Sequence, residues 1–585
     1  QAPETQNFVP LLSKRGRMEL SRNGIDEAQR LYRRILELAP EVLEYRKSLG
    51  RCLILQKKEQ EAVEVWREAL KKTGASRLEL YQFLIDSLLE HKMYDECLKA
   101  FQEARVGLGN PGLFAEERAG VLMAVNRGDE AMEEYLLALT YGTFKPDIFE
   151  KLYQRNGPNW NLEERLKALI EHGDNPVLKK ALLEVYFRRI DSDSLKAIMA
   201  LLGSGGSIDD LLFDRTIQSV FTQPTAWLRT LMAEVIRSRP SSTLSYRLAP
   251  VMLKFPDQDE TQLLQSETLA ATVSQSEPCP DIQLRFQLLT ALAQFRLDAL
   301  HDASGAERWL VKAMASSVGA SSSLLKAVFI SLRLNVFRGE FTKAEADLAR
   351  ARGLLSESLS GIPPHLPVQP PFPAPEESYE FPEIDAFVSS DNTPRLLFEE
   401  AWLLAHEGKF QDSLDRIKTL TQDYPNSLWL NDALSLALTI TMGSVGNFEP
   451  LKNWFSAERA STIGSFPQAL DFLEATQKQA SGTAFALDAE ALAIMVSENL
   501  ASPATLLPRI DEFRKKNPAH LSGADLLWMK WRLMKKGNAP PDQQVTILRE
   551  FQDRYSSDLR TRRAQQMTTI LSAPIKPEAD PSGRK

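Results

Sequence analysis

One side-chain pattern recurs along the first quarter of the chain. Each copy has a small residue, a large residue four positions later and a small or aliphatic residue three positions after that, which is the spacing of one face of an α-helix. The copies are Ala28-x3-Tyr32-x2-Ile35, Ala62-x3-Trp66-x2-Ala69, Cys97-x3-Phe101-x2-Ala104 and Ala131-x3-Tyr135-x2-Ala138, and their first residues are 34, 35 and 34 positions apart. This period predicts helix–turn–helix units that bury their apolar faces by stacking on one another.

The residues between the copies complete the unit. An amphipathic segment precedes each copy, and Gly16 and Gly50 occupy equivalent positions in two of these segments, where a neighbouring helix must approach closely. Asn23-Gly24 and Arg127-Gly128-Asp129 provide turns between the paired helices, and Pro40 follows the second helix of the first unit.

These residues resemble the tetratricopeptide repeat, a helix–turn–helix unit of 34 residues, over about Phe8 to Tyr141. Tyr81 stands where that family has an early aromatic residue, whereas Leu12 and Arg46 stand at the same place in the first two units. The resemblance implies an all-α, right-handed superhelical solenoid of helix–turn–helix repeats. The first helix of each pair would then line a concave groove.

The pattern returns later in the chain. Ser413, Ile417, Leu420 and Pro425 repeat the offsets of the first unit, and two further second helices are Ala306-x3-Leu310-x2-Ala313 and Ala344-x3-Leu348-x2-Ala351. Weaker candidates are 510–518 and 545–555, and residues 146–290 are helical by period without a clear phase. The Gly-Lys-Phe turn at 408–410 and the Tyr-Pro-Asn-Ser ending at 424–427 are similar to a repeat subtype common in bacterial envelope proteins.

We therefore expect five regions. They are an array of about four repeats (1–145), a degenerate helical-repeat region (146–360), a Pro-rich acidic and aromatic segment that interrupts the solenoid (361–394), a second repeat array (395–570) and a disordered tail (571–585). The Pro-rich segment contains nine prolines, which favour extended conformation or disorder over helix. It is either a spacer between two solenoid halves or an ordered strap that lays its aromatic side chains on the solenoid or on a partner.

The sequence contains no pattern that indicates catalysis. The six histidines are isolated, no metal-ligand spacing or phosphate-binding loop occurs, and the acidic pairs lie on amphipathic helices. We therefore expect no enzyme activity, no catalytic residue, no metal and no cofactor. A formal net charge of −8 argues against nucleic acid as a partner, and no apolar run is long enough to span a membrane.

The cysteines and the first residues of the chain give information on the cellular location of the protein. Cys52 and Cys97 fall on predicted buried helix positions, and with Cys279 they make an odd number that cannot form a complete disulfide framework. The start Gln1-Ala2-Pro3 is typical of a chain from which a signal peptide has been cleaved. We expect a bacterial protein exported to the periplasm or secreted, with the cytoplasm as the alternative.

Without catalytic chemistry, the groove is the candidate functional surface. The family geometry implies seven groove-facing residues: Ser13, Arg17, Lys47, Arg51, Gln82, Asp86 and Glu116. The best-known peptide-binding subfamily clamps a C-terminal carboxylate with paired Lys and Asn, and here Arg17, Arg51 and Asp86 replace the Asn residues. The groove is expected to be basic at its start and acidic further on, which suits a peptide of opposite polarity.

The leading hypothesis is a non-enzymatic scaffold for protein–protein interaction, within a multiprotein complex of the envelope or the extracellular space. Two alternatives stay open: the α-superhelical part of a cell-wall-processing enzyme, and a cytosolic adaptor or chaperone of a secretion machine.

Overall fold

The structure is a computed structural model that describes residues 8–71, 76–157, 160–203, 208–222, 225–256, 258–316, 321–360, 392–444 and 447–572. Within these ranges it contains thirty α-helices, two short 3-10 helices (Glu68–Lys71 and Ser497–Asn499) and one isolated bridge between Gly157 and Trp160. The chain forms two compact units, residues 1–212 and 213–585, each of which is described separately.

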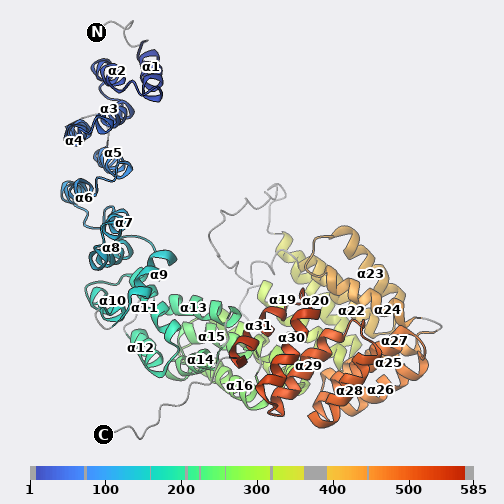
Figure 1. Ribbon diagram of the computed structural model, residues 1–585. Helices are drawn as coiled ribbons and strands as arrows, with labels where there is room; N and C mark the ends of the chain where they lie inside the picture. The colour runs from blue at the N-terminus through green and yellow to red at the C-terminus, as the bar shows by residue number, and fades with distance from the viewer. Residues whose placement is uncertain are drawn as a thin grey trace. The chain divides into compact units, whose positions relative to one another are not determined.

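Unit 1 is a succession of helix pairs, coloured blue to teal in Figure 1. Its helices are α1 (Val9–Ser21), α2 (Ile25–Leu38), α3 (Leu43–Leu55), α4 (Glu59–Arg67), α5 (Arg77–Glu90), α6 (Tyr94–Leu108), α7 (Ala115–Ala124), α8 (Gly128–Tyr141), α9 (Pro146–Arg155), α10 (Leu162–Glu171), α11 (Pro176–Arg189) and α12 (Ser192–Gly203). The unit boundary falls within α13 (Ile208–Thr222).

Unit 2 contains the remaining helices. They are α14 (Ala226–Ser238), α15 (Thr243–Leu253), α16 (Glu260–Gln275), α17 (Ile282–Asp298), α18 (Ala303–Ser316), α19 (Ser321–Phe337), α20 (Phe341–Ser360), α22 (Asn392–His406), α23 (Phe410–Asp423), α24 (Leu430–Gly443), α25 (Glu449–Thr462), α26 (Phe466–Gln479), α27 (Ala484–Val496), α28 (Pro503–Lys516), α29 (Gly523–Lys536), α30 (Pro541–Arg554) and α31 (Thr561–Ser572). The predicted all-α solenoid of helix–turn–helix repeats is confirmed.

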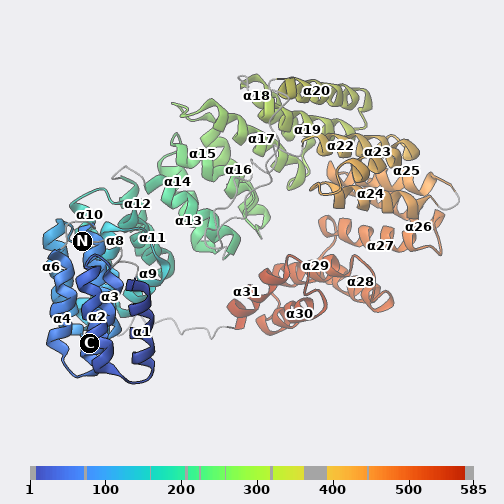
Figure 2. The same cartoon turned by 90° about the horizontal axis from the view of Figure 1, so that it is seen from above.

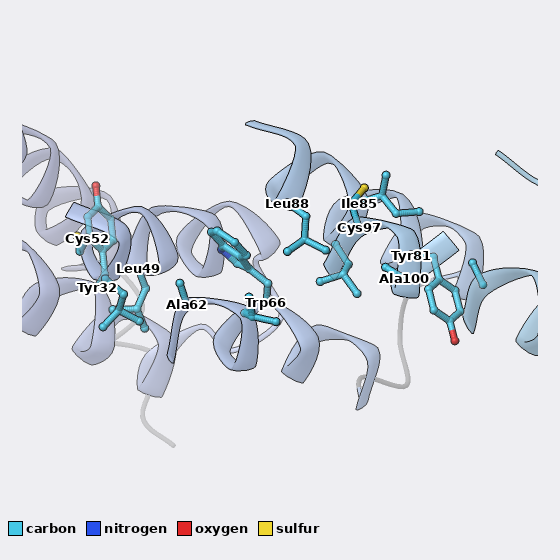
Figure 3. Packing of buried hydrophobic residues seen from close by; sticks show 14 of the residues in the cluster. Tyr32, Leu49, Cys52, Ala62, Trp66, Tyr81, Ile85, Leu88, Cys97 and Ala100 are labelled. Carbon is cyan, nitrogen blue, oxygen red and sulfur yellow. The ribbon is translucent and has the colours of Figure 1, made fainter. Parts of the chain in front are cut away.

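The repeating residues form the core, as predicted. In the first three units all nine are buried, and the same holds for both later second helices and for Ser413, Ile417 and Leu420. In the fourth unit Ala138 is only partly buried, and the neighbouring Leu139 is fully buried instead. Figure 3 shows side chains of the first three units, among them Tyr32, Trp66 and Cys97, following one another along this core.

The two glycines lie where helices approach closely. A methyl group built on Gly16 would lie 3.0 Å from the Tyr32 ring, and one built on Gly50 would overlap the Trp66 ring. Arg46, which stands in place of the family's aromatic residue, is buried and forms an ion pair of 2.9 Å with Glu68, which directly follows α4, the second helix of the same pair. A charged contact therefore replaces an aromatic one at that position.

The turns inside the helix pairs repeat with the same period. Asn23, Lys57, Lys92 and Asn126 have φ angles of 63°, 60°, 56° and 60°, in the left-handed region. These residues are 34, 35 and 34 positions apart. Asparagine adopts this region readily, whereas lysine does so at a cost.

Replacing Lys57 by glycine is therefore expected to stabilise the N-terminal repeats by about 0.5–1 kcal/mol, because glycine has no Cβ to strain this turn. Lys57 is exposed, and among the described residues the ion pair at this turn is made by the neighbouring Lys58, with Glu61. Lys14→Gly, at an exposed site inside α1, is the control and should destabilise by about 1 kcal/mol. Chemical denaturation measures both. A Lys57→Gly variant no more stable than the parent would contradict the strain argument.

Both cysteines of the core are free thiols in apolar surroundings. Burial raises the pKa of Cys52 to about 11 and the pKa of Cys97 to about 12. Cys279 is partly exposed.

We expect iodoacetamide at about pH 8 to label only Cys279 in the folded chain, because the thiolate is the reactive form and the buried thiols stay protonated. After denaturation all three cysteines should be labelled. Mass spectrometry of tryptic peptides measures the labelling, and rapid modification of Cys52 or Cys97 under native conditions would show that these helices open.

The Pro-rich segment falls almost entirely outside the described residues. Its last three residues are the exception, since α22 begins at Asn392. Pro394 is buried in the first turn of that helix, where a proline forgoes no intrahelical hydrogen bond. At the other predicted boundary, 571 and 572 belong to α31, and 573–585 lie outside the described residues.

In unit 2, α25 departs from regular stacking. Besides its neighbours α24 and α26, it contacts α19 and α22 of earlier helix pairs, and Figure 2 shows it close to α22 and α24. The Thr462 carbonyl oxygen lies 3.3 Å from Nδ1 of His301, and Arg459 donates a hydrogen bond of 3.1 Å to the His406 carbonyl oxygen. The Arg459 guanidinium also lies 5.6 Å from the centre of the Phe341 ring. One helix thus ties three repeats together.

Candidate interaction groove

The first helices of successive pairs line an open hollow of about 710 Å³ in unit 1. Helices α3 and α5, the start of α7 and the loop before it contribute the lining, which consists of Glu44, Lys47, Leu78, Glu79, Gln82, Phe83, Asp86, Leu113, Phe114 and Glu117. First helices line the hollow because, in a solenoid of helix pairs, the second helices cover the opposite side of the array.

The apolar part of the lining, called the floor below, consists of Leu78, Phe83, Leu113 and Phe114. Leu78 is 45% exposed, and Phe83 and Leu113 are partly exposed while they pack against the core. Phe114 precedes α7 with a φ of 55°, and its ring centre lies 6.0 Å from that of Phe101. Exposed apolar side chains beside a packed core are typical of sites that bind another protein.

The carboxylates of the lining, called the rim below, belong to Glu44, Glu79, Asp86 and Glu117. Glu44 and Glu117 make no hydrogen bond or ion pair among the described residues, and Asp86 only accepts a hydrogen bond of 2.8 Å from Gln82. Glu79 is held in a capping box with Ser76 at the start of α5. With four carboxylates and one ammonium among the lining residues, the net charge of the lining is negative.

Lys47 is the one cation among the lining residues, and Glu90 neutralises it. The two charged groups are 2.8 Å apart. The hydrogen bond that Lys47 donates to Glu90 raises the pKa of the Lys47 ammonium and lowers the pKa of the Glu90 carboxyl. Because the pair is internally balanced, Lys47 adds little positive potential to the hollow.

The structure brings together three of the seven residues predicted to face the groove. Lys47, Gln82 and Asp86 line the hollow, Ser13 is buried, Arg17 and Arg51 are exposed outside the lining, and Glu116 forms an ion pair of 2.5 Å with Lys145. A role in partner binding stays a prediction for all seven.

Sequence reasoning missed the apolar floor. Phe83 lies on the predicted first helix and could have been found by extending the groove-facing positions by one residue. Leu113 and Phe114 lie next to a turn of left-handed conformation that helical periodicity does not encode.

A second polar cluster lies in unit 2, where α19, α22 and α25 meet. Arg333 binds Glu399, which is fully buried, with nitrogen–oxygen distances of 2.9 to 3.1 Å. The His406 ring is also fully buried, its nitrogens have no hydrogen-bond partner, and its Nε2 lies 3.8 Å from the Glu458 carboxylate. Burial lowers the pKa of His406 well below its usual value and raises the pKa of Glu458 to about 7.

This cluster is expected to make stability depend on pH. The Glu458 side chain is 36% exposed to solvent although protein surrounds its carboxyl on the other sides, so the effect is moderate. Because its folded pKa is raised, the stability that Glu458 contributes is lost as the pH rises from its ordinary pKa through about 7. The Glu458→Gln variant stays neutral, so its melting temperature should fall less between about pH 5 and pH 8 than that of the parent. Glu449→Gln on the same helix is the control, and identical pH profiles for Glu458→Gln and the parent would contradict the prediction.

Neither a metal centre nor a membrane-spanning helix is found in the part of the chain that the structure describes. No group of three or more His, Cys, Asp or Glu there is placed to hold a metal ion. No helix there combines the length and the apolar character needed to cross a bilayer.

The repeated helix pairs define a fold class, an all-α solenoid of TPR-like helix–turn–helix repeats. No family model and no curated protein matches the sequence. Among solved structures, the chain is similar to the Cut9-Hcn1 hetero-tetramer of the APC/C, with 10% identity, 98% of each chain covered and a TM-score of 0.20. It is also similar to the P58(IPK) TPR domain, with 13% identity, 85% of this chain and 98% of that chain covered and a TM-score of 0.19. For yeast Tom70 the identity is 12%, 97% of this chain and 95% of that chain are covered, and the TM-score is 0.23.

Proposed function

We propose that this chain is a non-catalytic scaffold that binds a segment of a partner protein in the hollow formed by α3, α5 and α7. One observation carries the proposal: α5 and the loop before α7 present apolar side chains to a hollow that α3 and α7 complete, and Leu78 alone is 45% exposed. Association would be driven mainly by burial of this floor.

Position-specific cross-linking tests the proposal. A photoreactive amino acid replaces Gln82, which lines the hollow, or Lys99, which lies exposed on α6 outside it. The full chain carrying either residue is irradiated in an extract of its native cells. We expect one partner to be linked from Gln82 and not from Lys99, and equal yields from both positions would overturn the proposal.

Binding of the purified partner then decides whether the floor matters. Leu78→Gln should weaken binding about tenfold, because an exposed anchor contact is lost. Leu55→Gln changes an equally exposed leucine outside the hollow, which is 51% exposed, and should leave binding unchanged. Equal affinities of the two variants would place the interaction elsewhere.

We also propose that the scaffold belongs to an exported assembly of a bacterial envelope or the extracellular space. The similarity of the 408–427 repeat to envelope-associated repeats supports this location. The α-superhelical part of a cell-wall-processing enzyme and a cytosolic adaptor of a secretion machine are the alternatives. Fractionation of cells that express the tagged, full-length gene product separates them, and recovery in the cytoplasm alone would exclude the exported location.

A further inference from the structure

We infer that the segment bound in the hollow is an extended cationic peptide with one apolar anchor residue. This inference rests on the proposed function, because it concerns the same hollow, and it adds the chemical class of the partner. It departs from the sequence-based expectation of a groove that is basic at one end and acidic at the other.

The charges of the lining residues indicate that the partner is positively charged. Glu44 on α3, Asp86 on α5 and Glu117 on α7 form no ion pair among the described residues. Lys47 interacts electrostatically with Glu44 and Asp86 at longer range, and Lys145 does so with Glu117. The positive charge of Lys47 is cancelled by Glu90 at 2.8 Å. Because the lining holds four carboxylates and one ammonium, the hollow has a net negative charge, which disfavours an acidic peptide.

The apolar floor strengthens this preference. Leu78, Phe83 and Leu113 form a surface of low dielectric between the carboxylates, and such a surface concentrates the electric field of a charged cleft. A lysine or arginine is suited to this arrangement because its aliphatic stem can cover the floor while its charged end reaches a carboxylate. One aliphatic or aromatic side chain would occupy the floor itself.

The spacing of the helices gives the length of the segment. Packed helices are about 10 Å apart, so the rim from α3 to α7 spans roughly 20 Å. An extended chain covers this distance with about six residues. The expected partner motif is therefore six to eight residues long, with basic side chains on both sides of the anchor.

Selection from a peptide-display library on the full chain tests the inference. Random peptides of about twelve residues are long enough to fill the hollow. We expect enriched peptides to have net positive charge and an aliphatic or aromatic residue, and to bind more weakly as the salt rises from about 0.05 M to about 0.5 M. Enrichment of neutral or acidic peptides would overturn the inference.

A matched pair of double variants locates the charge effect. Asp86→Asn with Glu117→Gln removes two rim carboxylates, and Glu64→Gln with Asp95→Asn removes two exposed carboxylates on α4 and α6, outside the hollow. A fluorescein-labelled copy of the most enriched peptide should bind the first variant about tenfold more weakly and the second as tightly as the parent. Equal binding to both variants would overturn the inference.

The two proposals can fail separately. If the enriched peptides are acidic or neutral but lose affinity in Leu78→Gln, the hollow binds peptides and only the cationic class is wrong. If no peptide is enriched, or none responds to Leu78→Gln, both the hollow and the inferred class are wrong.

Discussion

Replacing Trp66 by alanine is expected to destabilise the N-terminal repeats by about 3–5 kcal/mol, because it opens a large cavity in the core. Trp66 is 0% exposed and is one of the largest fully buried side chains. It fills the space beside Gly50, and its ring stacks on His91 with centres 5.3 Å apart and planes 9° apart. Its indole nitrogen has no hydrogen-bond partner, so the loss is one of packing.

Amide hydrogen exchange measures the loss of stability helix by helix. Because each repeat contacts mainly its neighbours, the free energy of opening should fall in α3 to α6 and much less in unit 2. Met123→Ala, at an apolar site that is 48% exposed, is the control and should change little. A loss below about 1 kcal/mol for Trp66→Ala would mean that the helix register is wrong.

The second large effect is expected for Glu134→Ala. The Glu134 side chain is 7% exposed and binds two arginines: Arg105 through both oxygens, at 3.1 and 2.5 Å, and Arg118 at 2.7 Å. Removing the carboxylate leaves the Arg105 guanidinium, itself 8% exposed, buried without a counter-charge. Breaking such a pair from one side costs about 3–5 kcal/mol.

Glu130→Gln is the matched control for this variant. Glu130 lies one turn away on the same helix and pairs with Arg127 at the surface. Chemical denaturation should show a lower midpoint for Glu134→Ala and an unchanged one for Glu130→Gln. Equal midpoints would mean that the buried ion pair does not hold α6 and α8 together.

The regular part of the fold was predictable because its contacts are local. Ala28 and Tyr32 are one helical turn apart, and Gly16, which contacts the Tyr32 ring, is only sixteen residues upstream. Because the same pattern recurs about every 34 residues, each such contact is indicated by several copies of the repeat. The positive φ values at Lys57 and Lys92 were not predicted, because lysine does not mark such a turn. Their regular spacing shows that the stacking of the helices imposes the turn conformation.

The irregular parts could not be predicted, because they depend on residues far apart in the sequence. His301 and Thr462 are 161 positions apart, and no periodic signal connects them. The groove could be predicted only in part, because some of its properties also depend on residues far apart in the sequence. The helix positions of Lys47, Gln82 and Asp86 follow from the repeat, whereas the neutralisation of Lys47 depends on a residue 43 positions away on another helix.

The contacts that α25 makes with His301, Phe341 and His406 in three earlier helix pairs have a mechanical consequence. In a regular solenoid each helix pair contacts only its neighbours, so a pulling force can separate adjacent pairs one interface at a time. Through Arg459 and Thr462, α25 is fastened to the turns at His406 and His301, so the repeats between α17 and α23 cannot separate until those contacts break. This stretch is a stiff block, whereas the regular N-terminal array is compliant, and a pulling force would extend the array first.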